Sequence, residues 1–159
     1  MGSEMCIRDR GMHGQDFGFP GLHYAEKVSG MYVLVMDFLG PCVFQLFADK
    51  HFFFSSKTIL KLFKSLLGTI KNLHKCGFVH NDIKSDNVCM GTGCNGSVPV
   101  LFDFGMASRY INETTGKHIK NSRRGMRGTI QFASLGSLIK RATSRRDDLE
   151  SLGLSLIHI

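Results

Sequence analysis

Two short motifs contain side chains whose types and spacing suit phosphoryl transfer. They are His80-Asn81-Asp82-Ile83-Lys84-Ser85-Asp86-Asn87 and Asp103-Phe104-Gly105. The carboxylate of Asp82 can accept a hydroxyl proton, and Lys84 can place a compact positive charge beside a transferred phosphoryl group. Asn87 and Asp103 offer the oxygen ligands that Mg²⁺ prefers. The predicted chemistry is therefore phosphoryl transfer from ATP to a hydroxyl.

The spacing of the two motifs makes this prediction specific. Asp103 follows Asn87 by 16 residues, and a hydrophobic stretch runs into it. The alternative is that Asp82 and Asn87 only cap a turn, since Asp, Asn and Ser are common loop residues. Two motifs in register favour the chemical interpretation.

The elements that must position these residues are readable from periodicity. Between Thr58 and His74 the apolar residues recur at helical spacing, with Ser55 or Ser56 as N-cap, which predicts a helix ending just before the first motif. Phe78 and Val79 predict a short strand, residues 88–90 a second and residues 98–102 a third. The glycine-rich segment 91–97 predicts a hairpin turn between the last two, because no helix follows it as a phosphate-binding loop would require.

On these motifs the chain resembles a eukaryotic protein kinase, and within that superfamily the casein kinase 1 group. Three more segments support the resemblance: Val33 to Pro41 is similar to the last small-lobe strand and hinge, Arg127 to Ser134 to the end of the activation segment, and Ser144 to Gly153 to the start of a long buried helix. The resemblance implies an α+β, protein kinase-like fold that is truncated, with the hinge strands of the small lobe and the first half of the mostly helical large lobe.

The resemblance also implies roles for individual residues. Asp82 would be the catalytic base with Lys84 beside it, and Asn87 and Asp103 would hold Mg²⁺. At the ATP site, Met36 would gate the pocket behind adenine, while backbone groups of Asp37 and Leu39 would pair with the base. Asp148 would anchor the backbone of the catalytic loop; simple helix capping by Asp147 and Asp148 is the alternative.

Three residues depart from the pattern of the family. Asn81 replaces the usual arginine between His and Asp, so activation by pairing that arginine with a phosphorylated residue is not available. Gln131 stands where casein kinase 1 has an arginine for phosphorylated substrates, and Gln45 where a ribose-binding carboxylate is typical. The vaccinia-related and tau-tubulin kinases tolerate some of these changes, so the branch stays open. A pseudokinase scaffold is the alternative function.

The ATP-binding half of a kinase domain is incomplete in this sequence. Residues 11–30 contain five glycines, but no G-x-G-x-x-G is followed by a strand lysine. We therefore expect the isolated chain to be inactive. Residues 1–10 and 155–159 resemble translated sequencing-adapter read-through, which leaves residues 11–154 as the partial kinase domain. A targeting peptide is the alternative for the first end, although it has no continuous apolar core.

The charge is unevenly distributed along the chain. The net charge is +7, and the segment from Gly105 to Arg146 holds ten cations and one anion. Arg123, Arg124 and Arg127 would face the substrate, so acidic or phosphorylated proteins are the expected partners. A solvated basic loop and incidental nucleic-acid affinity are the alternatives, and no interleaved aromatic residues favour nucleic acid.

Composition limits the remaining possibilities. A chain of 159 residues with 43% hydrophobic content can bury one core, and it has no apolar run long enough for a membrane span. The five cysteines have irregular spacing, which is typical of reduced thiols in a cytoplasmic or nuclear protein. A zinc site from Cys76, His80, Cys89 and Cys94 would lack any C-x-x-C pair.

Overall fold

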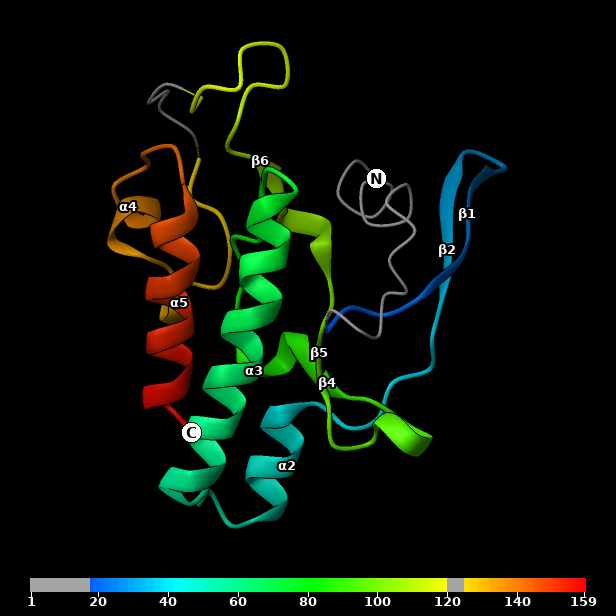
Figure 1. The fold of residues 1–159 in the computed structure, drawn as a ribbon, viewed down its shortest axis with the longest axis vertical. Helices are drawn as coiled ribbons and strands as arrows, with labels where there is room; N and C mark the ends of the chain where they lie inside the picture. The colour runs from blue at the N-terminus through cyan, green and yellow to red at the C-terminus, as the bar shows by residue number, and fades with distance from the viewer. Residues whose placement is uncertain (1–17, 120–124) are drawn as a thin grey trace.

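The computed structural model describes residues 18–119 and 125–159 and combines helices with short strands (Figure 1). The longer elements are β1 (Leu22–Val28), β2 (Met31–Met36), α2 (Val43–Asp49), α3 (Ser56–Lys75) and α5 (Arg145–Ile157). The shorter strands are β3 (Phe78–Val79), β4 (Val88–Met90), β5 (Pro99–Leu101) and β6 (Ser108–Arg109), and α4 (Leu135–Leu138) is a single helical turn. The short 3₁₀ turns are η2 (Ser85–Asn87), η3 (Gly93–Asn95), η4 (Phe104–Met106) and η5 (Ile130–Phe132).

Helix α3 confirms the predicted helix and places its C-terminal end beside the first motif. Ser55 is the N-cap, and its hydroxyl accepts a hydrogen bond from the backbone N–H of Thr58 at 3.2 Å. The buried face contains Leu62, Leu66, Ile70 and Leu73. Phe63 and Leu67 lie at the edge of this apolar stripe and stay partly exposed, each at 38%. The buried face is therefore narrower than the full set of apolar residues that recur at helical spacing in α3.

The strands predicted around the two motifs are confirmed as antiparallel pairs. β4 pairs with β5, with Cys89 opposite Val100, and β3 pairs with β6. The third strand is shorter than predicted, because it spans Pro99–Leu101 rather than residues 98–102. The turn between β4 and β5 contains the 3₁₀ turn η3. This hairpin brings the end of the first motif next to the start of the second.

The β1–β2 hairpin stands apart from the helices (Figure 1). It is antiparallel from Leu22 opposite Met36 to Val28 opposite Met31, and its two-residue turn has positive φ at Ser29 and Gly30. All six residues of β2 are exposed. Phe38 to Pro41 then lead into α2, which begins after a capping box between Cys42 and Gln45.

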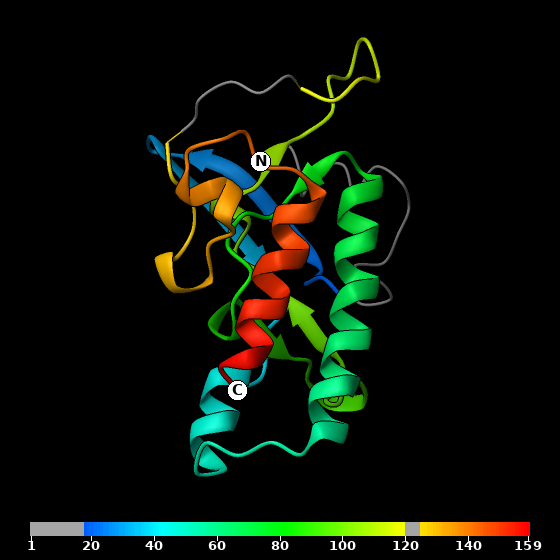
Figure 2. The same ribbon diagram turned by 90° about the vertical axis from the view of Figure 1, so that its left-hand side faces the viewer.

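The core lies between α3, α5 and the strands that flank the motifs. Helices α3 and α5 run side by side in both views (Figures 1 and 2), and α4 packs beside α5. Leu152 of α5 is 1% exposed and joins the core cluster with Ile70, Leu73 and Ile83. Within residues 18–119 and 125–159, no helix has the length and hydrophobicity needed to cross a lipid bilayer.

Helix α5 continues into the segment that resembles adapter read-through. The Oγ of Ser155 is buried and donates a hydrogen bond to the carbonyl oxygen of Ile83 at 3.0 Å, and Leu156 packs against the core. This segment therefore fits the helix sterically. The adapter origin of residues 155–159 stays a prediction.

Candidate active site

Residues 80–87, which the resemblance identifies as the catalytic loop, begin directly after α3 and β3. Gly77, at a φ of 86°, turns the chain out of the helix, and its N–H donates to the carbonyl oxygen of His74 at 3.0 Å. Glycine suits this position because a side chain disfavours positive φ. Phe78 and Val79 are buried and fix the strand that leads to His80. The helix end, the glycine and the buried strand together determine where Asp82 lies.

The carboxylate of Asp82 lies at the centre of a hydrogen-bonded cluster. Its Oδ1 accepts from the backbone N–H of Thr129 at 2.7 Å and from the Thr129 hydroxyl at 2.9 Å. Its Oδ2 accepts from Asn87 Nδ2 at 3.0 Å and lies 3.3 Å from Lys84 Nζ. The structure thus brings together three residues that the sequence singled out, Asp82, Lys84 and Asn87.

These contacts also set the charge of Asp82. Burial alone would raise the pKa of its carboxyl group, but the hydrogen bonds from Thr129 and the positive charge of Lys84 outweigh burial. The pKa therefore lies below 3.8. An ionised carboxylate only accepts hydrogen bonds, which is the state that a base needs at neutral pH.

Thr129 is a site residue that the sequence did not single out. Besides bonding to Asp82, its hydroxyl accepts a hydrogen bond from Lys84 Nζ at 2.8 Å. Gly128 precedes it at a φ of 82°, and a Cβ at Gly128 would collide with the carbonyl oxygen of Asn81. In the sequence, Thr129 belongs to the segment Arg127 to Ser134 that resembles the end of an activation segment, but that resemblance gave Thr129 no role of its own.

The two predicted Mg²⁺ ligands lie on neighbouring segments. The N–H of Phe102 donates to the carbonyl oxygen of Asn87 at 3.1 Å, which places Asp103 beside the Asn87 backbone. Both hydrogens of the Asn87 amide point to Asp82, so its Oδ1 is the oxygen left for a ligand. Asp103 is exposed, has a φ of 60°, and its Oδ1 accepts from Gly105 N–H at 3.2 Å. This donor set, an amide oxygen and a carboxylate, fits Mg²⁺.

His80 and Phe104 support the loop by packing. Their rings are 5.1 Å apart, and Phe19 lies on the other side of Phe104 at 5.7 Å. His80 is fully buried, with Nε2 donating to the carbonyl oxygen of Phe102 at 3.1 Å and Nδ1 accepting from Asp82 N–H. Burial lowers the pKa of His80 below 6.5, although the neighbouring carboxylates act in the opposite direction. A neutral imidazole matches these two bonds, one donated and one accepted.

Asp148 of α5 holds the backbone of the catalytic loop. Its Oδ2 accepts from His80 N–H at 2.9 Å and from the ring of His74 at 2.8 Å, while its Oδ1 accepts from Asn81 N–H at 2.9 Å. The neighbouring Asp147 accepts from the backbone N–H of Ser144 at 2.7 Å and so caps the helix. Asp148 therefore anchors the loop backbone, whereas Asp147 caps α5. The sequence did not single out His74, although a histidine on a buried helix face needs a polar partner.

The hinge residues lie at the exit of β2. Met36 ends the strand, and the N–H of Asp37 donates to the carbonyl oxygen of Gly21 at 2.9 Å. The Asp37 side chain accepts from Gly21 N–H at 2.8 Å and lies 2.7 Å from the His23 ring. The backbone of Leu39 has no hydrogen bond to another described residue. A small pocket beside the hinge is lined in part by Asp37, Leu39 and Val100.

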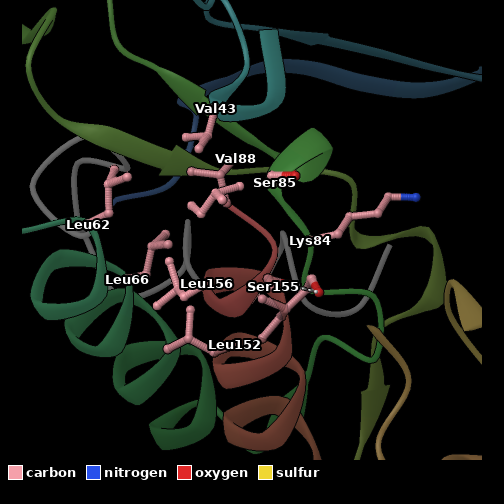
Figure 3. Close-up of a pocket in the computed structure, with 11 residues that line it drawn as sticks. Val43, Leu62, Leu66, Lys84, Ser85, Val88, Leu152, Ser155 and Leu156 are labelled. Atoms are coloured by element: carbon pink, nitrogen blue, oxygen red, sulfur yellow. Dashed lines mark hydrogen bonds between the residues drawn. The ribbon is translucent and has the colours of Figure 1, made fainter. Parts of the chain in front are cut away.

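A second small pocket lies beneath the catalytic loop (Figure 3). Leucines of α3 and α5 converge on it, among them Leu62, Leu66 and Leu152, while the side chain of Lys84 points away. Its wall is almost entirely apolar. The pocket therefore belongs to the support of the loop, and Lys84 is directed toward Thr129.

The predicted basic face is only partly available to a ligand. Arg123 and Arg124 lie outside the described residues. Arg127 donates to the carbonyl oxygen of Met106 at 3.3 Å, and Arg109 pairs with Glu113 and stacks on the ring of Phe78. Lys140 and Arg141 are exposed. Arg109 and Arg127, two of the ten cations, therefore have partners within the chain.

The four residues considered for zinc do not gather. His80 is buried against Phe102 and Phe104, Cys89 lies in β4, and Cys94 is exposed in the turn that follows. Across residues 18–119 and 125–159, no group of three His, Cys, Asp or Glu side chains could hold a metal ion.

One comparison with known proteins matches this arrangement. A family model described as a protein kinase domain matches residues 22–159. The match extends over most of the chain and includes the hinge, both motifs, Thr129 and helix α5. Kinase domains transfer phosphoryl groups, and the family generally uses ATP and Mg²⁺. With Asp82, Lys84 and Asn87 in contact and Asp103 beside them, the chain belongs to the protein kinase domain family.

Proposed function

We propose that this chain is the catalytic part of a serine/threonine kinase of casein kinase 1 type, with Asp82 as catalytic base. The observation that supports this most directly is the cluster of Asp82, Lys84, Asn87 and Thr129. Thr129 fills both acceptor positions of Oδ1, whereas Oδ2 has one short bond and one long contact to Lys84 at 3.3 Å. Oδ2 is therefore the oxygen that meets the substrate hydroxyl.

In this proposal Lys84 changes partner when substrate binds. The hydroxyl replaces the long Lys84 contact at Oδ2, and Lys84 then turns its charge to the phosphoryl group. Asn87 and Asp103 would hold Mg²⁺, which neutralises charge on the phosphates. Met36, Asp37 and Leu39 would line the adenine site, and Asp148 would keep the loop backbone in position.

The test uses the full-length protein that contains this chain, acting on an acidic protein such as casein. Asp82→Asn should lower kcat by about 10²-fold or more, because general base catalysis typically contributes that much. Asp86→Asn is the matched control, since Asp86 is an exposed carboxylate in the same loop. Equal activity of wild type and Asp82→Asn would remove Asp82 from the mechanism. The isolated 159-residue chain should be inactive, because its sequence has no glycine-rich loop with a following strand lysine.

We further propose that acidic or phosphorylated proteins are the substrates and that the protein acts in the cytoplasm or nucleus. Lys140 and Arg141 are exposed just before Thr143, which bonds to Asn81 beside the catalytic base. In the full-length protein, a Lys140→Ala/Arg141→Ala variant should therefore lower kcat/KM for an acidic peptide several-fold, with a weaker salt dependence. The same double change at Lys57 and Lys61, two exposed cations of α3, serves as control.

A pseudokinase scaffold is the second candidate, supported by Asn81 and Gln45. The side chain of Gln45 accepts a hydrogen bond from Cys42 N–H at 3.0 Å, so it caps α2. A scaffold would bind partners without phosphorylating casein. Titration of the full-length protein with MgATP discriminates the two: saturable binding together with turnover supports the kinase, whereas partner binding without turnover supports the scaffold.

A further inference from the structure

Two cysteines lie opposite each other where the segment that follows the hinge pairs with β4. Cys42 and Cys89 form an isolated antiparallel bridge. Next to them, Met90 N–H donates to the carbonyl oxygen of Pro41 at 3.0 Å, and Gly40 N–H donates to that of Met90 at 2.8 Å. The N–H of Cys42 itself donates to Gln45. Cys42 and Cys89 are thus directly opposite each other without a backbone hydrogen bond between them.

This type of pair has the spacing that a disulfide requires. In antiparallel pairs without hydrogen bonds, the Cα atoms are about 4.5 Å apart and the side chains lie on the same face. A disulfide needs a Cα separation of about 4.4–6.8 Å. Neither cysteine is in a disulfide in the structure, and Cys42 Sγ accepts a hydrogen bond from Gln45 N–H at 3.4 Å that it would exchange for the bond to Cys89. A bond between them therefore needs side-chain rotation and little backbone movement.

We propose that Cys42 and Cys89 are a redox-sensitive thiol pair that closes to an intramolecular disulfide when hydrogen peroxide oxidises the protein. The thiolate of Cys42 attacks one peroxide oxygen, the O–O bond breaks, and a sulfenic acid and hydroxide form; the hydroxide takes up the proton that the Cys42 thiol released and becomes water. The sulfur of Cys89 then attacks Cys42 Sγ, and hydroxide leaves and takes up the proton of Cys89. The two thiols lose two electrons in total, and peroxide is reduced to two molecules of water.

The environments of the two cysteines set the order of these steps. Cys42 is partly exposed, whereas Cys89 is only 9% exposed, so peroxide reaches Cys42 first. Cys89 therefore acts second, when the sulfenic acid is already beside it.

The bond would connect two segments that flank the candidate active site. Cys42 follows the hinge residues Leu39 to Pro41, and Cys89 follows Asn87 by two positions in the sequence. Such a disulfide fixes the hinge exit to β4. Intracellular disulfides are usually transient, and a dithiol reductant should open this one. The thiol chemistry does not depend on the proposed kinase activity.

Peptide mapping of the wild-type chain tests the pair directly. The reduced 159-residue chain is treated with a small excess of hydrogen peroxide, its remaining thiols are alkylated, and a non-reducing digest is analysed by mass spectrometry. We expect one cross-linked species joining the Cys42 and Cys89 peptides, two hydrogens lighter than their sum. The thiol count should fall from five to three, and dithiothreitol should restore it.

Two comparisons make the result decisive. The Cys94→Ser variant, which removes an exposed thiol, should form the same cross-link in the same yield. In 6 M urea the preference for this pair should disappear, because the folded backbone is what brings the two cysteines together. The proposal is overturned if oxidised Cys42 never links to Cys89 in the folded chain, if Cys94 is cross-linked as often, or if urea leaves the pairing unchanged.

Discussion

At the scale of single residues, Asn81 connects the catalytic loop to two other segments of the chain. Its Nδ2 donates to the carbonyl oxygen of Met106 at 2.8 Å and to Ser108 Oγ at 3.0 Å, and its Oδ1 accepts from Thr143. An arginine here would add a charge that needs a partner. The amide is neutral, and it links the segment after Asp103 to the segment before α5 without a phosphorylated residue.

Replacing Asn81 separates two contributions to stability. Asn81→Ala removes three side-chain hydrogen bonds and places alanine at a φ of 69°, so unfolding free energy should fall by about 2–4 kcal/mol. Asn81→Gly removes the same bonds but tolerates that φ, so it should be about 1 kcal/mol less destabilising than Asn81→Ala. Urea denaturation measures both. If the two variants match wild type, the bonds of Asn81 do not stabilise the loop.

His80 should make stability depend on pH. Burial lowers the pKa of folded His80 below 6.5, the ordinary value for the unfolded chain, so the unfolded state binds more protons as pH falls below 6.5. The contribution of His80 to the unfolding free energy is fully present above pH 6.5. As the pH falls from 6.5 toward the pKa of folded His80, this contribution decreases by at most about 1.4 kcal/mol per pH unit. The lowered pKa of Asp82 acts only below about pH 4, outside this window.

The measurement compares wild type with His80→Gln, whose amide can both donate and accept a hydrogen bond. Urea denaturation at each pH from 5 to 8 gives the unfolding free energy. Below pH 6.5, this free energy should change less steeply with pH in the variant than in wild type. Parallel curves for the two proteins would show that His80 does not titrate on unfolding.

At the scale of elements, α3 is the support on which the loop depends. Leu73 lies in the last turn of α3 and is fully buried, whereas Leu60 on the same helix is 66% exposed. Leu73→Ala should lower unfolding free energy by about 2–5 kcal/mol, since truncating a buried leucine leaves a cavity. Leu60→Ala is the control and should change it by about 0.5 kcal/mol or less. Similar losses in the two variants would contradict the observed burial.

The contrast between α3 and the site shows how much the sequence could predict. Helix α3, its N-cap Ser55 and the strands beside the motifs were predictable, because periodicity and capping are local properties. The bonds of Thr129 to Asp82 join residues 47 positions apart, and that of Asp148 to His80 joins residues 68 apart. Local preferences do not determine such contacts, which depend on how the elements pack. For Asp148 only the family resemblance suggested the role.

At the scale of the whole molecule, two regions that are far apart in the sequence meet at one carboxylate. Asp148 of α5 accepts hydrogen bonds from His74 at the end of α3 and from the backbone of His80 and Asn81 in the catalytic loop. Its exposure is 1%. Water therefore cannot replace Asp148 as the acceptor for these groups without opening the core. The position of Asp82 thus depends on the packing of α5 against α3.

Asp148→Ala should lower the unfolding free energy by about 3–5 kcal/mol, because it leaves buried donors without an acceptor. Asp86→Ala removes an exposed carboxylate from the catalytic loop and should cost about 0.5 kcal/mol or less. Amide hydrogen exchange provides a local measurement: His80 and Asn81 should be protected in wild type and in Asp86→Ala. In Asp148→Asn, whose Nδ2 cannot accept a bond, at least one of them should exchange faster. Unchanged protection in that variant would mean that packing alone holds the loop against α5.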